Sequence, residues 1–298
     1  MPDKTPCCGS SHKVSLMLWM MACAPQGPGA LLAEPGELGA YGAARVDVTV
    51  QARVTEALSV AVTFPADDAG WPDDAALPAP AVVLVQGGLV EPVRYQWLAS
   101  HLAAQGYVVL SPDHPGDLAI FAAENGRYAL DGVAAGGGVL DGLIEADAPA
   151  GVGGHSLGGV VSSMLWADDA RFEALFLLAS YPADGTDVEA RSAPVLSLTG
   201  ELDAQADVAQ VEDGWERFSG PRYLGVVSSM GHYGWTDEDS AEDLAMGGDD
   251  DPEARSDDLT RADALTPLVA FLDATLRADG SAEVALEAGD FSGVTWSP

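Results

Sequence analysis

Short apolar runs alternate with longer amphipathic stretches along most of the chain. The short runs, rich in valine, leucine and alanine, are expected strands at 46–50, 58–64, 82–85, 108–110, 151–154, 175–178, 195–198 and 223–227. The longer stretches are expected helices at 95–105, 133–145, 156–166, 208–218 and 262–278. From the third strand onward strands and helices mostly alternate, which predicts an α/β fold with a mostly parallel central sheet flanked by helices. One continuous pattern without an internal repeat predicts a single domain.

The run Gly154-His155-Ser156-Leu157-Gly158 has the G-x-S-x-G pattern of a nucleophile elbow, a serine on a sharp turn between a strand and a helix. Chain segments approach so closely at such a turn that the flanking positions tolerate almost no side chain, and glycine meets that need. The hydroxyl would stand at a helix N-terminus, where free backbone N–H groups favour the negative charge of an acyl-transfer intermediate. We therefore expect Ser156 to be a nucleophile, with a plain small-residue turn as the alternative.

The expected general base follows from the order of residues along the chain. In hydrolases with this elbow the nucleophile comes first, an acid second and a histidine last. His232 is the only histidine beyond Ser156, and it lies in a glycine-flanked loop after the expected strand 223–227. His232 is thus the expected base, and an exposed loop histidine is the alternative.

The acid should lie on a loop after a buried strand. The expected strand 195–198 is followed at once by Thr-Gly-Glu-Leu-Asp, and the strand-end position indicates Asp203. Glu201 follows the glycine directly and is expected to point to solvent or shape the turn. Glu201 and Asp207 remain alternatives for the acid.

Taken together, these segments resemble the α/β-hydrolase superfamily, and within it the serine esterases grouped around dienelactone-hydrolase-like proteins, platelet-activating-factor acetylhydrolases, chlorophyllases and polyester hydrolases. The resemblance runs from about residue 45 to 277 and rests on 80–88, 98–99, 106–116, the elbow, 199–203 and 231–232. The family usually has His-Gly where this chain has Gln86-Gly87. Dienelactone hydrolases carry a cysteine in place of Ser156, which argues against their substrate.

The resemblance also implies two backbone donors for the oxyanion. Leu157, just after the nucleophile, would supply one N–H group. The second would come from the loop after the expected strand 82–85, from Gly88 or, as a fallback, from Gly87.

The surroundings of the expected site indicate an open cleft. Segment 179–194 is too short for a large helical cap domain. Tyr181, Tyr233 and Trp235 lie on loops expected near the site and are candidates for a substrate pocket, with local packing as the alternative for each.

The expected activity is hydrolysis of carboxylic esters through a Ser-His-Asp triad and an acyl-enzyme. The substrate would be a small-molecule or polymeric ester of moderate size, and no cofactor or metal is expected. An acyltransferase with the same triad and a non-catalytic surface-binding protein on this scaffold are the alternatives.

The N-terminus has a pattern of its own. Lys4 and Lys13 precede the apolar run 14–22, which is too short to span a bilayer but suits a signal peptide. Cys23 follows Met-Met-Ala and resembles a bacterial lipobox, so segment 1–23 predicts an exported lipoprotein or a periplasmic or extracellular protein. An unprocessed tail of a cytoplasmic protein is the alternative. The segment 24–42, rich in Gly, Pro and Ala, is the expected linker to a catalytic domain at 43–298.

Charge and cysteine content limit the partners. The net charge of −33 excludes nucleic acid as an expected partner and argues against electrostatic adhesion to anionic membranes. A lipid anchor is then the only expected membrane contact, and the charge suits a salty setting. All three cysteines lie at or before position 23, so no disulfide can staple the catalytic domain. The acidic insert 237–258, with Asp249 to Asp251, is expected to be a solvated loop, with a calcium site as the alternative.

Overall fold

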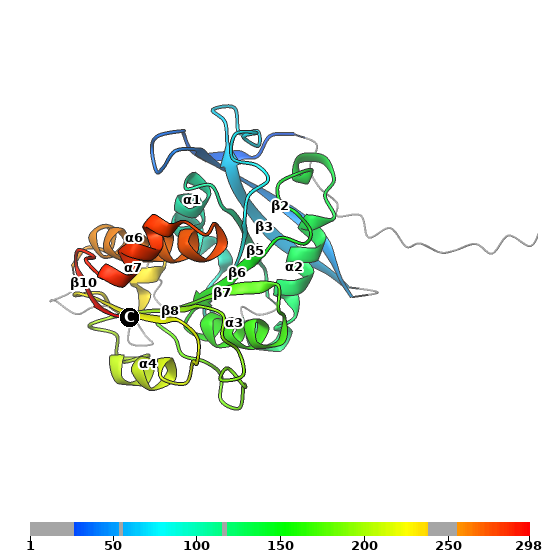
Figure 1. Cartoon of the computed structure of the whole chain (residues 1–298). Coiled ribbons are helices and arrows are strands. Elements are labelled where there is room, and N and C mark those ends of the chain that lie inside the picture. Colours follow the sequence, from blue (N-terminus) through cyan, green and yellow to red (C-terminus); the bar gives the residue numbers. More distant parts are fainter. Residues whose placement is uncertain (1–26, 54–55, 115–117, 238–254) are drawn as a thin grey trace, which may run out of the picture.

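A sheet of ten strands runs through the computed structural model (Figure 1), counted over the described residues 27–53, 56–114, 118–237 and 255–298. The strand order is β1-β2-β3-β5-β4-β6-β7-β8-β9-β10. The strands are β1 Ala30–Ala33, β2 Gly42–Arg53, β3 Glu56–Ala66, β4 Ala81–Val85, β5 Val108–Pro112, β6 Ala150–His155, β7 Phe172–Leu178, β8 Val195–Gly200, β9 Arg222–Val227 and β10 Val294–Ser297. The expected signal segment with Cys23 and the acidic triplet 249–251 lie outside the described residues.

The six central strands, from β5 to β9 in the sheet order, pair in parallel with their neighbours. Antiparallel pairs add β3, β2 and β1 at one edge and β10 at the other. This confirms the predicted mostly parallel sheet, and every predicted strand lies within an observed one. The four-residue strands β1 and β10 were not predicted, because so short a run has no readable period. Since β1 falls inside the expected linker 24–42, that segment is partly strand and extends the sheet.

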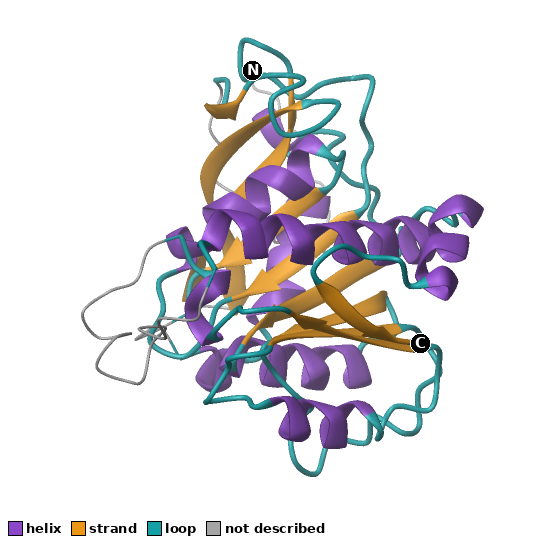
Figure 2. Cartoon of the chain, turned by 90° about the vertical axis from the view of Figure 1, so that its left-hand side faces the viewer, coloured by secondary structure: helices purple, strands orange, loops and turns teal. Residues whose placement is uncertain are grey.

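Helices cover both faces of the sheet (Figures 1 and 2). They are α1 Gln96–Ala104, α2 Asn125–Ala134, α3 Leu157–Asp168, α4 Val208–Trp215, α6 Asp257–Leu276 and α7 Gly280–Ala288. The helices α1, α6 and α7 contribute to one hydrophobic core, whereas α2 and α3 contribute to the other. The short helix α7 was not predicted; Asp279 caps it by accepting hydrogen bonds from the backbone N–H groups of Ser281 and Ala282.

The central strands divide their side chains between these two cores. In β4, Val82 and Leu84 belong to the core under α1 and α6, whereas Val83 and Val85 belong to the core over α2 and α3. All four are buried, as expected for a strand covered on both faces. The strand is therefore apolar at successive positions, and its carboxyl end delivers the next residues to the rim of the sheet.

The second helix differs from its prediction. A helix was expected at 133–145, but α2 ends at Ala134 and a short 3-10 turn follows at Gly138–Leu140. Gly136 and Gly137 have φ of 73° and 114°, a backbone conformation that ends a right-handed helix. The apolar residues beyond them, such as Leu143, are buried in a loop, which produced a misleading helical pattern.

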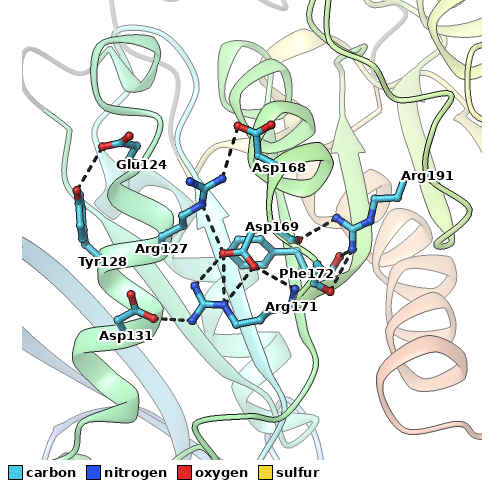
Figure 3. A network of polar contacts seen from close by, with 10 residues as sticks. Glu124, Arg127, Tyr128, Asp131, Asp168, Asp169, Arg171, Phe172 and Arg191 are labelled. Atoms are coloured by element: carbon cyan, nitrogen blue, oxygen red, sulfur yellow. Dashed lines mark hydrogen bonds and ion pairs between the residues drawn. The ribbon is translucent and has the colours of Figure 1, made fainter.

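A cluster of arginines and aspartates ties α2 to the end of α3 (Figure 3). Arg171 bonds Asp131 of α2 at 2.5 Å and Asp169 at 2.8 Å, and Arg127 lies 3.4 Å from Asp169. The hydrogen bonds from Arg171 hold the pKa of Asp169 below its usual range. Because the Arg171 carbonyl accepts a hydrogen bond from the N–H of Ala150, the cluster anchors the end of β6 opposite the elbow.

The connection between β7 and β8, residues 179–194, contains turns and bends but no helix, so no cap domain is inserted there. Among the described residues, no helix combines the length and the apolar character needed to cross a bilayer.

Candidate active site

Ser156 occupies the sharp turn between β6 and α3. Its φ of 52° and ψ of −123° are strained for a residue with a side chain. A Cβ on Gly158 would collide with the carbonyl oxygens of Val85 and Gln86, and a Cβ on Gly154 would collide with that of Val85. The flanking glycines are thus required by backbone contact with the end of β4, as expected for a nucleophile elbow.

Ser156, His232 and Asp203 form one hydrogen-bonded chain. The Ser156 Oγ lies 3.1 Å from His232 Nε2, and His232 Nδ1 lies 2.8 Å from Asp203 Oδ2. His232 and Asp203 are buried, whereas Ser156 is partly exposed. With a neutral imidazole that donates its Nδ1 proton to the carboxylate, Nε2 is free to accept the hydroxyl proton of the serine.

Backbone groups fix the carboxylate that faces His232. The Oδ1 of Asp203 accepts hydrogen bonds from the N–H groups of Gln205 and Ala206, both at 2.8 Å. The alternative acids have other contacts. Glu201 accepts a hydrogen bond from the N–H of Ser229 and so ties the two loops together, and Asp207 caps α4.

Hydrogen bonds from α1 and α6 hold the loop that carries His232. Trp97 Nε1 donates to the carbonyl of Trp235 at 2.8 Å, and Arg261 Nε donates to that of Gly234 at 2.9 Å. Arg94 adds a bond to the side chain of Thr236. These donors come from elements packed on the core, so the short 3-10 turn His232–Trp235 is held in place.

Leu157 and the loop after β4 line the same pocket as Ser156. Leu157 is the first residue of α3, where an N–H has no partner within the helix. In the loop after β4, the N–H of Gly87 donates to the Tyr95 hydroxyl at 2.9 Å. Gly88 packs over Leu157, and its N–H has no hydrogen bond to any described residue. Of the two glycines named from the sequence, the structure leaves Gly88 available.

Gln86 stands where the resembled family usually has histidine, and its side chain braces this loop. Its Nε2 donates to the carbonyl of Val90 at 2.9 Å, and its Oε1 lies 3.2 Å from Nδ1 of the buried His114. Burial lowers the pKa of His114 to about 4, so the ring is neutral near pH 7.

A pocket of about 230 Å³ opens beside Ser156. Its apolar lining comes from Leu89, Val90, Leu118 and Leu157. The other lining residues besides Ser156 are Gly88, His155, Gln205, His232 and Tyr233. No residue with a fixed charge lines it among those the structure describes.

Only one of the three aromatic residues named for the pocket lines it. Tyr233 does so, but Trp235 is buried in the core under α6, and Tyr181 packs against Gly214 of α4. The sequence analysis did not name Leu89 or Leu118 as pocket residues. The glycine-rich loop after β4 was a signal for Leu89, whereas no signal was visible for Leu118.

Over the described ranges, no group of three or more histidine, cysteine or acidic residues is arranged to hold a metal ion. The acidic triplet considered for calcium lies outside those ranges.

Comparison with known proteins agrees with this geometry. No curated protein matches the chain significantly. The model of the alpha/beta hydrolase family matches residues 81–240, more than half of the chain, and this segment includes β4, the elbow, Asp203 and His232. The chain therefore belongs to the alpha/beta hydrolase family.

Proposed function

We propose that this protein is a serine hydrolase that cleaves carboxylic esters. The observation that carries the proposal is the contact of Ser156 Oγ with His232 Nε2 at 3.1 Å, backed by Asp203 at 2.8 Å, on a strained strand-to-helix turn. A serine is a weak nucleophile unless an adjacent base takes its proton, and this arrangement supplies that base.

The proposed reaction has two acyl-transfer steps. His232 Nε2 takes the Ser156 proton as Oγ attacks the ester carbonyl, and the N–H groups of Leu157 and Gly88 stabilise the oxyanion. The alcohol leaves with the proton from His232, which gives an acyl-serine. Water, deprotonated by the same imidazole, then attacks the acyl carbon, and the acid leaves as Ser156 regains its proton.

The pocket supports a neutral ester with a short acyl group. Its volume of about 230 Å³ is below the range of roughly 300–1,000 Å³ typical of pockets for drug-sized ligands. Among the described residues its lining offers no arginine or lysine for a substrate carboxylate, and the net charge of −33 disfavours an anionic ligand.

A fluorophosphonate probe tests the proposal directly, because it reacts with an activated serine. The wild-type chain should be labelled stoichiometrically, and Ser156→Ala should not be labelled. p-Nitrophenyl acetate and butyrate should be cleaved faster than the palmitate ester or a carboxylate-bearing analogue. Absence of labelling in the folded wild-type protein would refute the proposal, and a product ratio that shifts wholly to the ester of an added alcohol would indicate an acyltransferase.

A further inference from the structure

His155, the residue before the serine, is fully buried and lies between two other parts of the site. Its Nδ1 is 2.9 Å from the Tyr95 hydroxyl, and its Nε2 is 2.9 Å from the backbone carbonyl oxygen of His232. Its ring also packs on the His232 ring, with centroids 4.7 Å apart. The Tyr95 hydroxyl in turn accepts the N–H of Gly87 at 2.9 Å.

The chemistry of these groups fixes the proton positions. A carbonyl oxygen can only accept, so His155 must carry its proton on Nε2 and donate it to His232. The Nδ1 of a neutral ring is then an acceptor, and it receives the hydroxyl proton of Tyr95. Gly87 N–H can only donate, and it does so to the Tyr95 oxygen. One arrangement with a neutral His155 therefore satisfies every contact from Gly87 to His232.

Burial favours the same state. It holds the pKa of the His155 imidazole well below its ordinary value, and proximity to His232 lowers it further. His155 thus stays neutral where an ordinary histidine would take up a proton.

The chain of contacts joins segments at the carboxyl ends of three different strands. Gly87 lies after β4, His155 ends β6 beside the nucleophile, and His232 lies after β9. A Cβ on Gly87 would lie 2.8 Å from the Tyr95 hydroxyl oxygen and 2.9 Å from His155 Nδ1, so a side chain there would displace these contacts.

We propose that Tyr95 and His155 are positioning residues that set the base and an oxyanion donor in register with the nucleophile. The Tyr95 hydroxyl occupies the N–H of Gly87, which leaves that of Gly88 to face the reacting carbonyl. His155 holds the backbone of His232 and so keeps its Nε2 within reach of Ser156. The inference rests on the proposed function, since it assigns roles within the same site.

Tyr95→Phe tests the first contact, because it removes one hydroxyl and keeps the ring. It should lower kcat for p-nitrophenyl acetate by about 10- to 100-fold, since small displacements of reacting groups cost up to about that much. KM should stay within about twofold, because the hydroxyl does not line the pocket. Tyr107→Phe is the matched control: Tyr107 is equally buried and its hydroxyl also bonds a partner, Asp273, but neither residue lines the pocket. This control should lose thermal stability comparably and retain kcat.

His155→Phe and the double variant with Tyr95→Phe test whether the two residues act as a unit. If they do, the double variant should be about as slow as His155→Phe alone. ¹⁵N NMR of histidine-labelled protein should show His155 neutral with its proton on Nε2.

Three results would overturn the proposal: an unchanged kcat in Tyr95→Phe, equal losses of kcat in Tyr95→Phe and Tyr107→Phe, or a proton on Nδ1 of His155. They are distinguishable from failure of the proposed function, because wild-type protein that reacts with a fluorophosphonate at Ser156 keeps that function whatever the variants do.

Discussion

Replacing Asp203 by asparagine should stop the proposed base, His232, from accepting the serine proton without disturbing the fold, and the contacts of Asp203 give the reason. Oδ1 accepts two backbone hydrogen bonds, from Gln205 and Ala206. An asparagine can keep both only if its carbonyl oxygen takes that place, because an NH₂ group cannot accept. The NH₂ group must then face His232 Nδ1 and donate to it.

This donation moves the imidazole proton to the wrong nitrogen. With Nδ1 accepting, the proton lies on Nε2 and faces the Ser156 hydroxyl, so the ring can no longer take the serine proton. The same tautomer change in serine proteases costs about 10⁴-fold in kcat, which corresponds to roughly 5 kcal/mol of barrier. We expect a loss of this order for Asp203→Asn.

Glu201→Gln is the matched control, because Glu201 is an exposed carboxylate on the same loop. Its Oε2 accepts the N–H of Ser229, and the amide oxygen of glutamine can keep that bond. The activity of Glu201→Gln should differ from that of the wild type by less than about threefold. Initial rates with p-nitrophenyl acetate, together with thermal unfolding to verify the fold, compare the two variants. The reasoning is refuted if Asp203→Asn loses less than tenfold or if Glu201→Gln loses more than Asp203→Asn.

Four further outcomes are expected. Ser156→Ala and His232→Ala should fall to about the same residual rate, because a nucleophile and its base are not additive; a largely active His232→Ala would contradict this. Gly158→Ala should lower the free energy of unfolding by about 3 kcal/mol and abolish fluorophosphonate labelling, because backbone oxygens occupy the Cβ position, whereas Gly280→Ala, with open space, should do neither. The pKa of His114 is about 4 in the folded protein and near 6.5 in the unfolded chain, so the unfolded state binds the proton first as the pH falls. Between pH 7 and 5 the free energy of unfolding, measured by denaturant titration, should therefore fall by about 2 kcal/mol more in the wild type than in His114→Gln. Equal losses in the two proteins would disprove the low pKa of His114. With a net charge of −33, the melting temperature should rise steadily with sodium or potassium chloride up to about 1 M, where the screening length is only about 3 Å; a flat or falling curve would show that the charges are already compensated.

Eight of the ten strands in the described residues were predictable because each contains an apolar run separated from the next by polar or glycine-rich segments. The error at 133–145 arose because buried side chains of a loop can repeat like those of a helix. There the glycines at 136 and 137 were the better signal, since both adopt a positive φ. Strand β1 and helix α7 depend on tertiary pairing and capping that no local pattern displays.

The residues that meet at the elbow were predictable for a different reason. The G-x-S-x-G pattern, the order along the chain and the ends of buried strands depend on backbone constraints that leave a trace in sequence. The residues of the pocket wall leave no such trace in the sequence. Tyr233 and Trp235 are two residues apart on one short turn, yet the first lines the pocket and the second fills the core. Their direction depends on contacts with α1 and α6, which are distant in sequence.

The choice between Gly87 and Gly88 as the second oxyanion donor also depends on a contact that the local sequence does not display. The sequence presents two adjacent glycines, of which the resemblance favours Gly88, and in the structure the difference between them comes from one hydroxyl group, that of Tyr95. No lysine or arginine lines the pocket among the described residues, so in the proposed reaction backbone N–H groups are the expected donors to the oxyanion. Fixed dipoles stabilise charge only when they are held in place beforehand, and the buried contacts from Gly87 through Tyr95 and His155 to His232 provide that rigidity.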